Sequence, residues 1–182
     1  MQARRRLRLA LHLARRFFGA LSPKGPPALD EAWVAEVLGA GSGTHELWSS
    51  MSGADRRHAV EVARRVSGRL GEGVDPDVLA AALLHDVGKV ASGLGTIGRV
   101  PATLVGLAGG RARAPSWSVS PRFSIRRRFG QYLSHGDQGA RLLGDVGAPT
   151  LAVAWAADHH RPITSWTVPV GTGKILKEAD DD

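Results

Sequence analysis

The spacing of apolar and polar residues along this 182-residue chain predicts helices almost throughout. In most segments the apolar positions recur every three to four residues, which is the period of an amphipathic helix. We find no alternating β-type run of any length and no internal repeat. The pattern therefore predicts an all-α fold, a compact bundle of several helices around one core, and the length suffices for such a domain.

Capping and breaking residues set the expected helix ends. Ser52 followed by Asp55 resembles a capped start, and that helix is expected to run to Leu70 and stop at Gly71. Asp75 and Pro76 open the next helix, because proline is favoured at the first helical position. The other expected helices span residues 30–38, 96–107, 126–133, 135–146, 149–159 and 173–180, with an irregular basic loop at 109–124.

The first 27 residues have a pattern of their own. Over residues 4–21, arginines and a histidine fall on one helical arc and leucines and phenylalanines on the other, with no acid before Asp30. A Pro/Gly-rich break from Ser22 to Pro27 follows. We therefore divide the chain into a basic amphipathic helix and linker, residues 1–27, and a helical domain, residues 28–182. Docking on the domain, partial disorder, contact with nucleic acid and peripheral contact with an anionic membrane all stay open for residues 4–21.

Composition narrows the possible chemistry. The chain has no cysteine, so it forms no disulfide, and a metal site would use nitrogen and oxygen ligands. No apolar stretch approaches the length of a membrane span, and we expect a cytoplasmic, alternatively membrane-peripheral, location. The net charge is +7. From Val87 to Gly136 there is no acid, and a basic surface of this kind attracts phosphates, although a solvated basic loop is the simpler alternative. The basic residues of that stretch are Lys89, Arg99, Arg111, Arg113, Arg122, Arg126, Arg127 and Arg128.

The most informative pair is His85-Asp86, at the end of the apolar run from Val78 to Leu84. Such a run is expected to be buried, and a buried carboxylate without a partner is costly. A metal ion would offset that cost. On a helix the two neighbours point about 100° apart, so the imidazole and the carboxylate can reach different ions. The alternative is a helix end with both side chains in solvent.

Further candidate ligands lie on other predicted helices. His58 shares a face with Val62, and His135 precedes Gly139 by one turn, where glycine permits the close approach of a neighbouring helix. Each such residue alone is more often part of the core. Several imidazoles at the ends of separate helices, beside carboxylates, favour a site for two borderline or hard cations. The other candidates are His159, after the apolar run 151–157, and Asp180, after Ala179.

The order His58, His85-Asp86 and Asp180 resembles the signature of the HD superfamily of metal-dependent phosphohydrolases. Its most specific element is the Leu-Leu-His-Asp-x-Gly-Lys pattern, here Leu83 to Lys89. With His135 and His159 the chain is similar to dinuclear members such as HD-GYP phosphodiesterases and diadenosine-tetraphosphate hydrolases. The resemblance covers about Ser52 to Asp182.

The chain departs from the HD-GYP pattern after His159-His160. It continues as Arg161-Pro162-Ile163-Thr164, without the motif that names the HD-GYP group, which argues against cleavage of cyclic dinucleotides. Asp181 is an alternative to Asp180 as the last ligand. We favour Asp180, because Ala179-Asp180 matches the family's usual Ala-Asp pair.

The resemblance implies an HD-domain-like bundle and a divalent-metal phosphohydrolase acting on a nucleotide or another phosphate ester. A first metal, with manganese, iron and magnesium as candidates, would be held by His58, His85, Asp86 and Asp180. Asp86 would bridge to a second metal, held also by His135 and His159. A hydroxide between the cations would attack phosphorus, since a metal can lower the pKa of water from about 15.7 to about 7. Asp86 and Lys89 are the expected catalytic residues, and Lys89 and Arg161 would contact the substrate.

Two other functions stay open. Some sites with this ligand set hold two irons and oxidise carbon. The domain could instead be a non-catalytic, nucleotide- or membrane-linked signalling module in which the metal is structural. No nucleic-acid fold signature is present, so no specific nucleic-acid partner is predicted.

Overall fold

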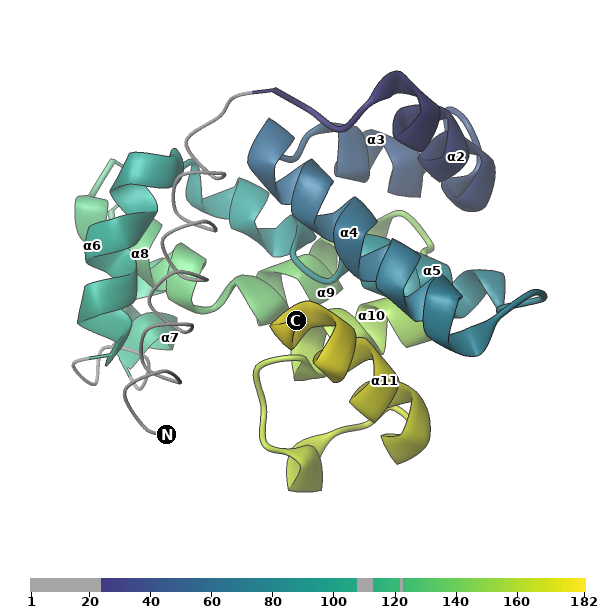
Figure 1. The fold of residues 1–182 in the computed structure, drawn as a ribbon. Helices are drawn as coiled ribbons and strands as arrows, with labels where there is room; N and C mark the ends of the chain where they lie inside the picture. The colour runs from purple at the N-terminus through teal and green to yellow at the C-terminus, as the bar shows by residue number, and fades with distance from the viewer. Residues whose placement is uncertain (1–23, 108–112, 122) are drawn as a thin grey trace, which may run out of the picture.

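A computed structural model describes residues 24–107, 113–121 and 123–182 of the chain (Figure 1). Within those residues the regular elements are helices and no strand occurs, so the all-α prediction is confirmed. The elements are α2 (Ala28–Leu38), α3 (Gly43–Ser49), α4 (Gly53–Leu70), α5 (Pro76–Leu84), the 3₁₀ helix η1 (Val87–Ser92), α6 (Thr96–Leu107), α7 (Ala114–Ser118), α8 (Ile125–Leu133), α9 (His135–Asp145), α10 (Thr150–Asp158), the 3₁₀ helix η3 (Ile163–Ser165) and α11 (Val170–Asp181).

Helix α5 lies at the centre of the core. Every residue from Val78 to Leu84 is buried, because the helix is apolar on all sides and packs between α4 and α10. Helix α11 lies along α4, and α9 packs against both α10 and η1. The end of α5, which carries the His-Asp pair, is thereby surrounded by other helices.

The capping residues act as the sequence predicts. The Ser52 hydroxyl accepts a hydrogen bond from the Asp55 amide at 3.2 Å and starts α4, which ends at Gly71 with a positive φ of 78°. The Asp75 carboxylate caps α5, whose first residue is Pro76. These short-range signals predict both ends of α4 and the start of α5 correctly.

Two helices were not predicted. Helix α3 begins where the Ser42 hydroxyl accepts from the His45 amide, and it buries Trp48 in the core. Helix α7 lies within the segment expected to be an irregular loop, and its five residues are too few to show a period. The prediction for residues 4–21 lies outside the described residues.

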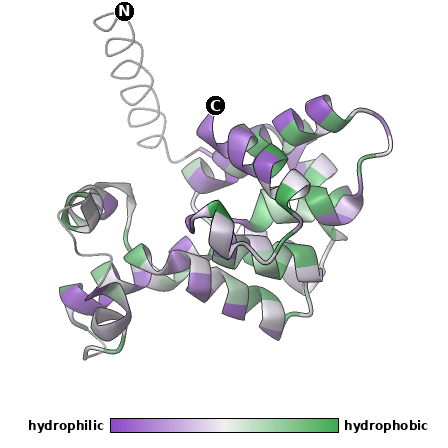
Figure 2. Ribbon diagram, turned by 90° about the horizontal axis from the view of Figure 1, so that it is seen from below, coloured by the Kyte–Doolittle hydropathy of each residue, from purple (hydrophilic) through white to green (hydrophobic). Residues whose placement is uncertain are grey.

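Helices α6, α7 and α8 form a lobe beside the main body, seen at the left of Figure 1 and Figure 2. Helices α6 and α7 pack on α8, and α8 joins the lobe to the body through its contacts with η1 and α9. Among the described residues, no helix combines the length and apolar character needed to cross a bilayer.

Candidate metal centre

His85 and Asp86 lie where α5 gives way to η1, and both are buried. His85 keeps helical backbone angles, whereas Asp86 leaves them, with φ of −99° and ψ of 2°. The two oxygens of Asp86 face different histidines. Its Oδ2 lies 3.5 Å from His85 Nε2, and its Oδ1 lies 3.2 Å from His135 Nε2 and 3.7 Å from His159 Nε2. Asp86 therefore stands between two groups of histidines.

The first cluster consists of His58, His85 and Asp180. Asp180 Oδ1 lies 2.9 Å from His58 Nε2 and 3.6 Å from His85 Nε2. These residues come from α4, the end of α5 and α11. Helix α11 is held against α4 near the site, since the Arg65 guanidinium donates to the Ala179 carbonyl at 3.1 Å.

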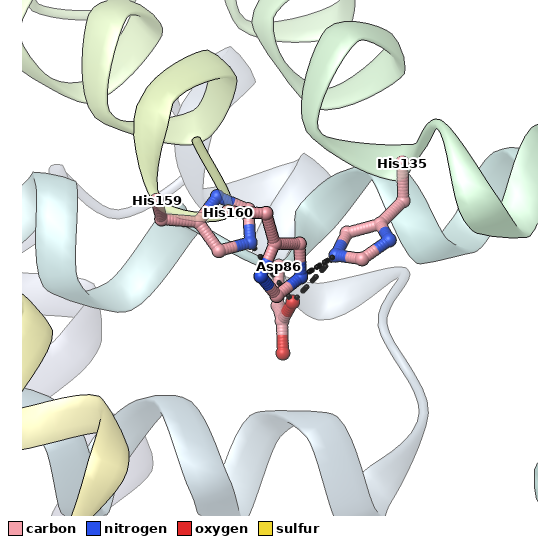
Figure 3. A group of neighbouring side chains, drawn as sticks. All are labelled: Asp86, His135, His159 and His160. Carbon is pink, nitrogen blue, oxygen red and sulfur yellow. Dashed lines mark hydrogen bonds and ion pairs between the residues drawn. The ribbon is translucent and has the colours of Figure 1, made fainter. Parts of the chain in front are cut away.

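The second cluster consists of Asp86, His135, His159 and His160 (Figure 3). The ring nitrogens His160 Nε2 and His135 Nε2 are 3.0 Å apart. His160 was not among the predicted ligands. The doubled His159-His160 was the available signal, but helical periodicity places neighbouring side chains on different faces. The chain turns out of α10 at this point, and both rings reach the cluster.

Three of the histidines share one local arrangement. The Nδ1 of His85, His135 and His159 lies 2.7–2.8 Å from the backbone carbonyl three residues earlier. A carbonyl only accepts, so each Nδ1 carries the proton and each Nε2 has its lone pair towards the clusters. Those carbonyls belong to the last turns of α5, α8 and α10, where helix carbonyls lack helical partners.

The donor set fits cations. His85 Nε2 and His159 Nε2 are buried without a hydrogen-bond partner, and both face carboxylate oxygens. Two ligands bound at about 2.1 Å and 90–109° apart on one ion are about 3.0–3.4 Å from each other. The distances from the carboxylate oxygens of Asp86 and Asp180 to the histidine Nε2 atoms, 2.9–3.7 Å, bracket that range. Lone pairs directed at anionic oxygens require a positive charge between them.

The pKa shifts of the site residues also indicate that a positive charge is needed between the carboxylates and the histidines. Burial opposes a charge on His85, but Asp86 and Asp180 outweigh it and raise the pKa of His85 to about 10. Burial also opposes ionisation of Asp86, yet Lys89 and His85 hold its pKa well below the usual value. Burial lowers the pKa of His159, which keeps that imidazole neutral. Without a metal, a proton on His85 supplies the missing positive charge.

Lys89 closes one side of the site. Its ammonium contacts Asp86 Oδ2 and lies 3.9 Å from Asp55 Oδ1. Asp55 is held in turn by Arg99 Nη1, at 2.8 and 2.7 Å from its two oxygens, and by the Ser52 hydroxyl at 2.6 Å. A chain of alternating charges thus links α6 to the shared carboxylate.

Arg161, the second residue expected to contact substrate, is engaged elsewhere. Its guanidinium donates to Asp137 Oδ1 at 2.8 Å and to Asp158 Oδ1 at 3.2 Å. The structure therefore places Arg161 next to His160 in the chain but pairs it with carboxylates outside both clusters.

Close backbone contact between η1 and α9 brings Asp86 and His135 together. A Cβ added to Gly88 would lie 1.9 Å from the His135 carbonyl oxygen and 2.4 Å from the Gly139 nitrogen. Only glycine at position 88 permits this approach, and Gly139 supplies the opposing surface, as its position one turn after His135 predicted.

Comparison with known proteins identifies the family. The family model described as HD domain matches residues 56–181, well over half of the chain. The chain belongs to the HD-domain superfamily of metal-dependent phosphohydrolases. No curated protein matched, and no solved structure matched. HD domains bind divalent metals, and the matched region of this one contains both clusters.

Proposed function

We propose that this HD domain hydrolyses a phosphate ester, a nucleotide or another phosphorylated small molecule, with two divalent cations. The observation that carries the proposal is the position of Asp86, whose two oxygens face histidines of two different clusters. A carboxylate shared in this way is suited to bridge two ions.

The chain supplies a separate set of ligands for each ion. His58, His85 and Asp180 would hold one ion, and His135, His159 and His160 the other, with Asp86 shared. The hydrogen bonds to backbone carbonyls set the ring orientations before any ion binds, which lowers the cost of ordering the ligands. When bound, two such cations lower the pKa of a water between them and neutralise charge on phosphate oxygens.

Lys89 is the proposed contact to the substrate. An ammonium has three N–H donors, and contacts with Asp86 and Asp55 leave one for a phosphate oxygen. Asp86 and Lys89 thus act together, the first by holding the ions and the second by orienting the anion. Arg161 reaches a phosphate only by exchanging Asp137 for it, an exchange that its 43% exposed side chain permits.

Phosphate release is the direct test. The purified full-length chain, stripped of metal and reloaded with manganese, iron or magnesium, is assayed on nitrophenyl phosphate mono- and diesters and on a panel of nucleotides. We expect metal-dependent hydrolysis that falls at least about 1000-fold in Asp86→Ala and His85→Ala, because each change removes a ligand. His45→Ala is the matched control, since His45 is a histidine on α3 outside both clusters.

The outcomes separate the proposal from its alternatives. Full activity in Asp86→Ala and His85→Ala would refute it. Oxygen uptake by the iron-loaded protein, without phosphate release, would assign the site to oxidation. Tight nucleotide binding without turnover under every metal would assign the domain to signalling.

A further inference from the structure

Charge is divided unevenly between the lobe and the rest of the chain. Residues 94–134 carry seven arginines and no acid. The described part of this stretch, which contains α6, α7 and α8 and is called the basic lobe below, carries five of those arginines. Residues 1–27 carry seven further Lys and Arg and no acid. The remaining residues hold ten Lys and Arg against all 17 Asp and Glu. The main body is therefore acidic and the lobe beside it basic.

Some of the arginines of the basic lobe face the body. Arg99 pairs with Asp55, and Arg128 donates to the carbonyls of Ser92 and Gly93. Arg113 and Arg126 are exposed to solvent, and the Arg126 guanidinium lies 5.4 Å from the ring centre of Trp117. The outer surface of the basic lobe therefore carries positive charge.

The stretch from Val119, which follows α7, to Ile125, the first residue of α8, also exposes large apolar side chains. Val119 is 80% exposed, Phe123 is 95% exposed and Ile125 is 59% exposed, all within seven residues of chain. We call these three residues the apolar tip. The large exposed apolar residues of the main body are separated along the chain, namely Leu29, Leu70, Val146, Ile163 and Val170.

We propose that the apolar tip and the arginines beside it form a membrane-binding surface that inserts into the interface of an anionic bilayer. Moving exposed aliphatic and aromatic side chains from water into the acyl boundary lowers the free energy, and arginines bind the headgroup phosphates. Among the described residues, the anionic headgroups repel the acidic main body and attract the basic lobe.

The apolar tip favours lipid over the other anionic partners. A nucleic-acid backbone would pair with the arginines, but it offers nothing to three neighbouring apolar side chains. A stable protein interface buries about 800 Å² on each partner, far more than three side chains supply. A bilayer accepts a small exposed apolar surface, because its interface adapts to the inserted side chains.

This surface is separate from the metal clusters. The apolar tip ends in the first turn of α8, at Ile125, whereas His135 follows the last turn. A helix of this length rises about 12 Å between its first and last residues. The inference therefore does not depend on the proposed hydrolysis, and the two can fail independently.

The test is co-sedimentation of the full-length chain with phosphatidylcholine vesicles, prepared with and without phosphatidylglycerol. We expect binding to the anionic vesicles that weakens as salt is raised. The double variant Phe123→Ser, Ile125→Ser should weaken binding at least about ten-fold, because it removes two inserting side chains. The matched control, Leu29→Ser, Val170→Ser, changes two exposed apolar residues of the body and should bind like the unaltered chain.

A second measurement reports insertion directly. Brominated lipids should quench Trp117, and the quenching should be lost in Trp117→Phe and in the tip variant. Vesicle binding that is unchanged by the tip variant would overturn the proposal, because the contact would then lie elsewhere, for example in residues 1–23. Absence of vesicle binding, or tighter binding to a single- or double-stranded oligonucleotide, would also overturn it.

Discussion

Replacing Gly88 by alanine should disrupt both the fold and the metal centre, because the contact between η1 and α9 leaves no room for a side chain. The new Cβ would lie 1.9 Å from the His135 carbonyl oxygen and 2.4 Å from the Gly139 nitrogen, both backbone atoms. To reach the 3.0 Å that real Cβ contacts respect, the two elements must separate by at least about 1.1 Å.

Such a separation is costly in two ways. Overpacking a well-packed core costs about 1–3 kcal/mol, and we expect the upper end because backbone atoms cannot turn aside. The movement also displaces the very residue whose Nε2 lies 3.2 Å from Asp86 Oδ1. We therefore expect manganese affinity to fall about 10–100-fold, the loss typical when the support of a metal ligand is disturbed.

Two of the glycines of α9, Gly139 and Gly144, supply a graded control. A Cβ on Gly139 would lie 3.2 Å from the Gly88 nitrogen, so Gly139→Ala should cost less. Gly144 has nothing within 4 Å of an added Cβ, and Gly144→Ala should stabilise the protein by about 0.5–1 kcal/mol through helix propensity.

The assay combines urea denaturation with manganese titration of each variant. If Gly88→Ala unfolds at the same urea concentration as the unaltered chain and binds manganese equally well, the contact between η1 and α9 does not exclude a side chain and does not support the metal centre.

Four further predictions concern the site and the residues that support it. Metal affinity should rise about ten-fold per pH unit between pH 6 and 8 for each proton displaced, because the pKa of His85 is raised to about 10 and the ion must remove that proton. Calorimetry across this range measures the affinity, and an affinity that does not change with pH would contradict the prediction. Without metal, the protonated His85 stabilises the fold fully at pH values below its usual pKa of 6.5. This stabilisation is lost as the pH rises towards the folded-state pKa of about 10, so the metal-induced rise in Tm should be larger at pH 8 than at pH 6. Asp55→Asn should raise KM more than it lowers kcat, because it removes the charged partner that positions Lys89 beside Asp86. Arg99→Met should act in the same direction, and Arg99→Lys should be less impaired than Arg99→Met. Equal effects on KM and kcat would contradict a positioning role for Asp55. Asp158→Ala should cost about 2–4 kcal/mol in urea unfolding, since the buried carboxylate accepts hydrogen bonds from Thr167 and Val168, and a cost below about 1 kcal/mol would contradict this.

Local signals in the sequence predicted most of the helices. The caps at Ser52 and Asp75, and the stop at Gly71, act over a few residues and are visible in the chain itself. Helices α3 and α7 were missed because short helices show no clear period, and tertiary contacts decide whether they form. The apolar run of α5 indicated its burial directly, since a helix apolar on all sides has no face to offer to water.

For the candidate site as well, some features could be predicted from the sequence and others could not. The sequence indicated which residues could bind metal, and His58, His85, Asp86, His135, His159 and Asp180 all lie in the two clusters. It did not indicate His160, the pairing of Lys89 with Asp55, or the engagement of Arg161 by Asp137. These features depend on where separate elements meet.

By itself, the sequence determined most of the helices and the histidines at the ends of three of them, because hydrogen bonds to the preceding turn need only local chain. The tertiary structure alone decided which of those rings lie beside Asp86 and which arginines face outwards. Distances between residues far apart in the chain follow from packing, and here they rest on backbone contact at Gly88 and Gly139. No periodicity or spacing within one segment contains that information.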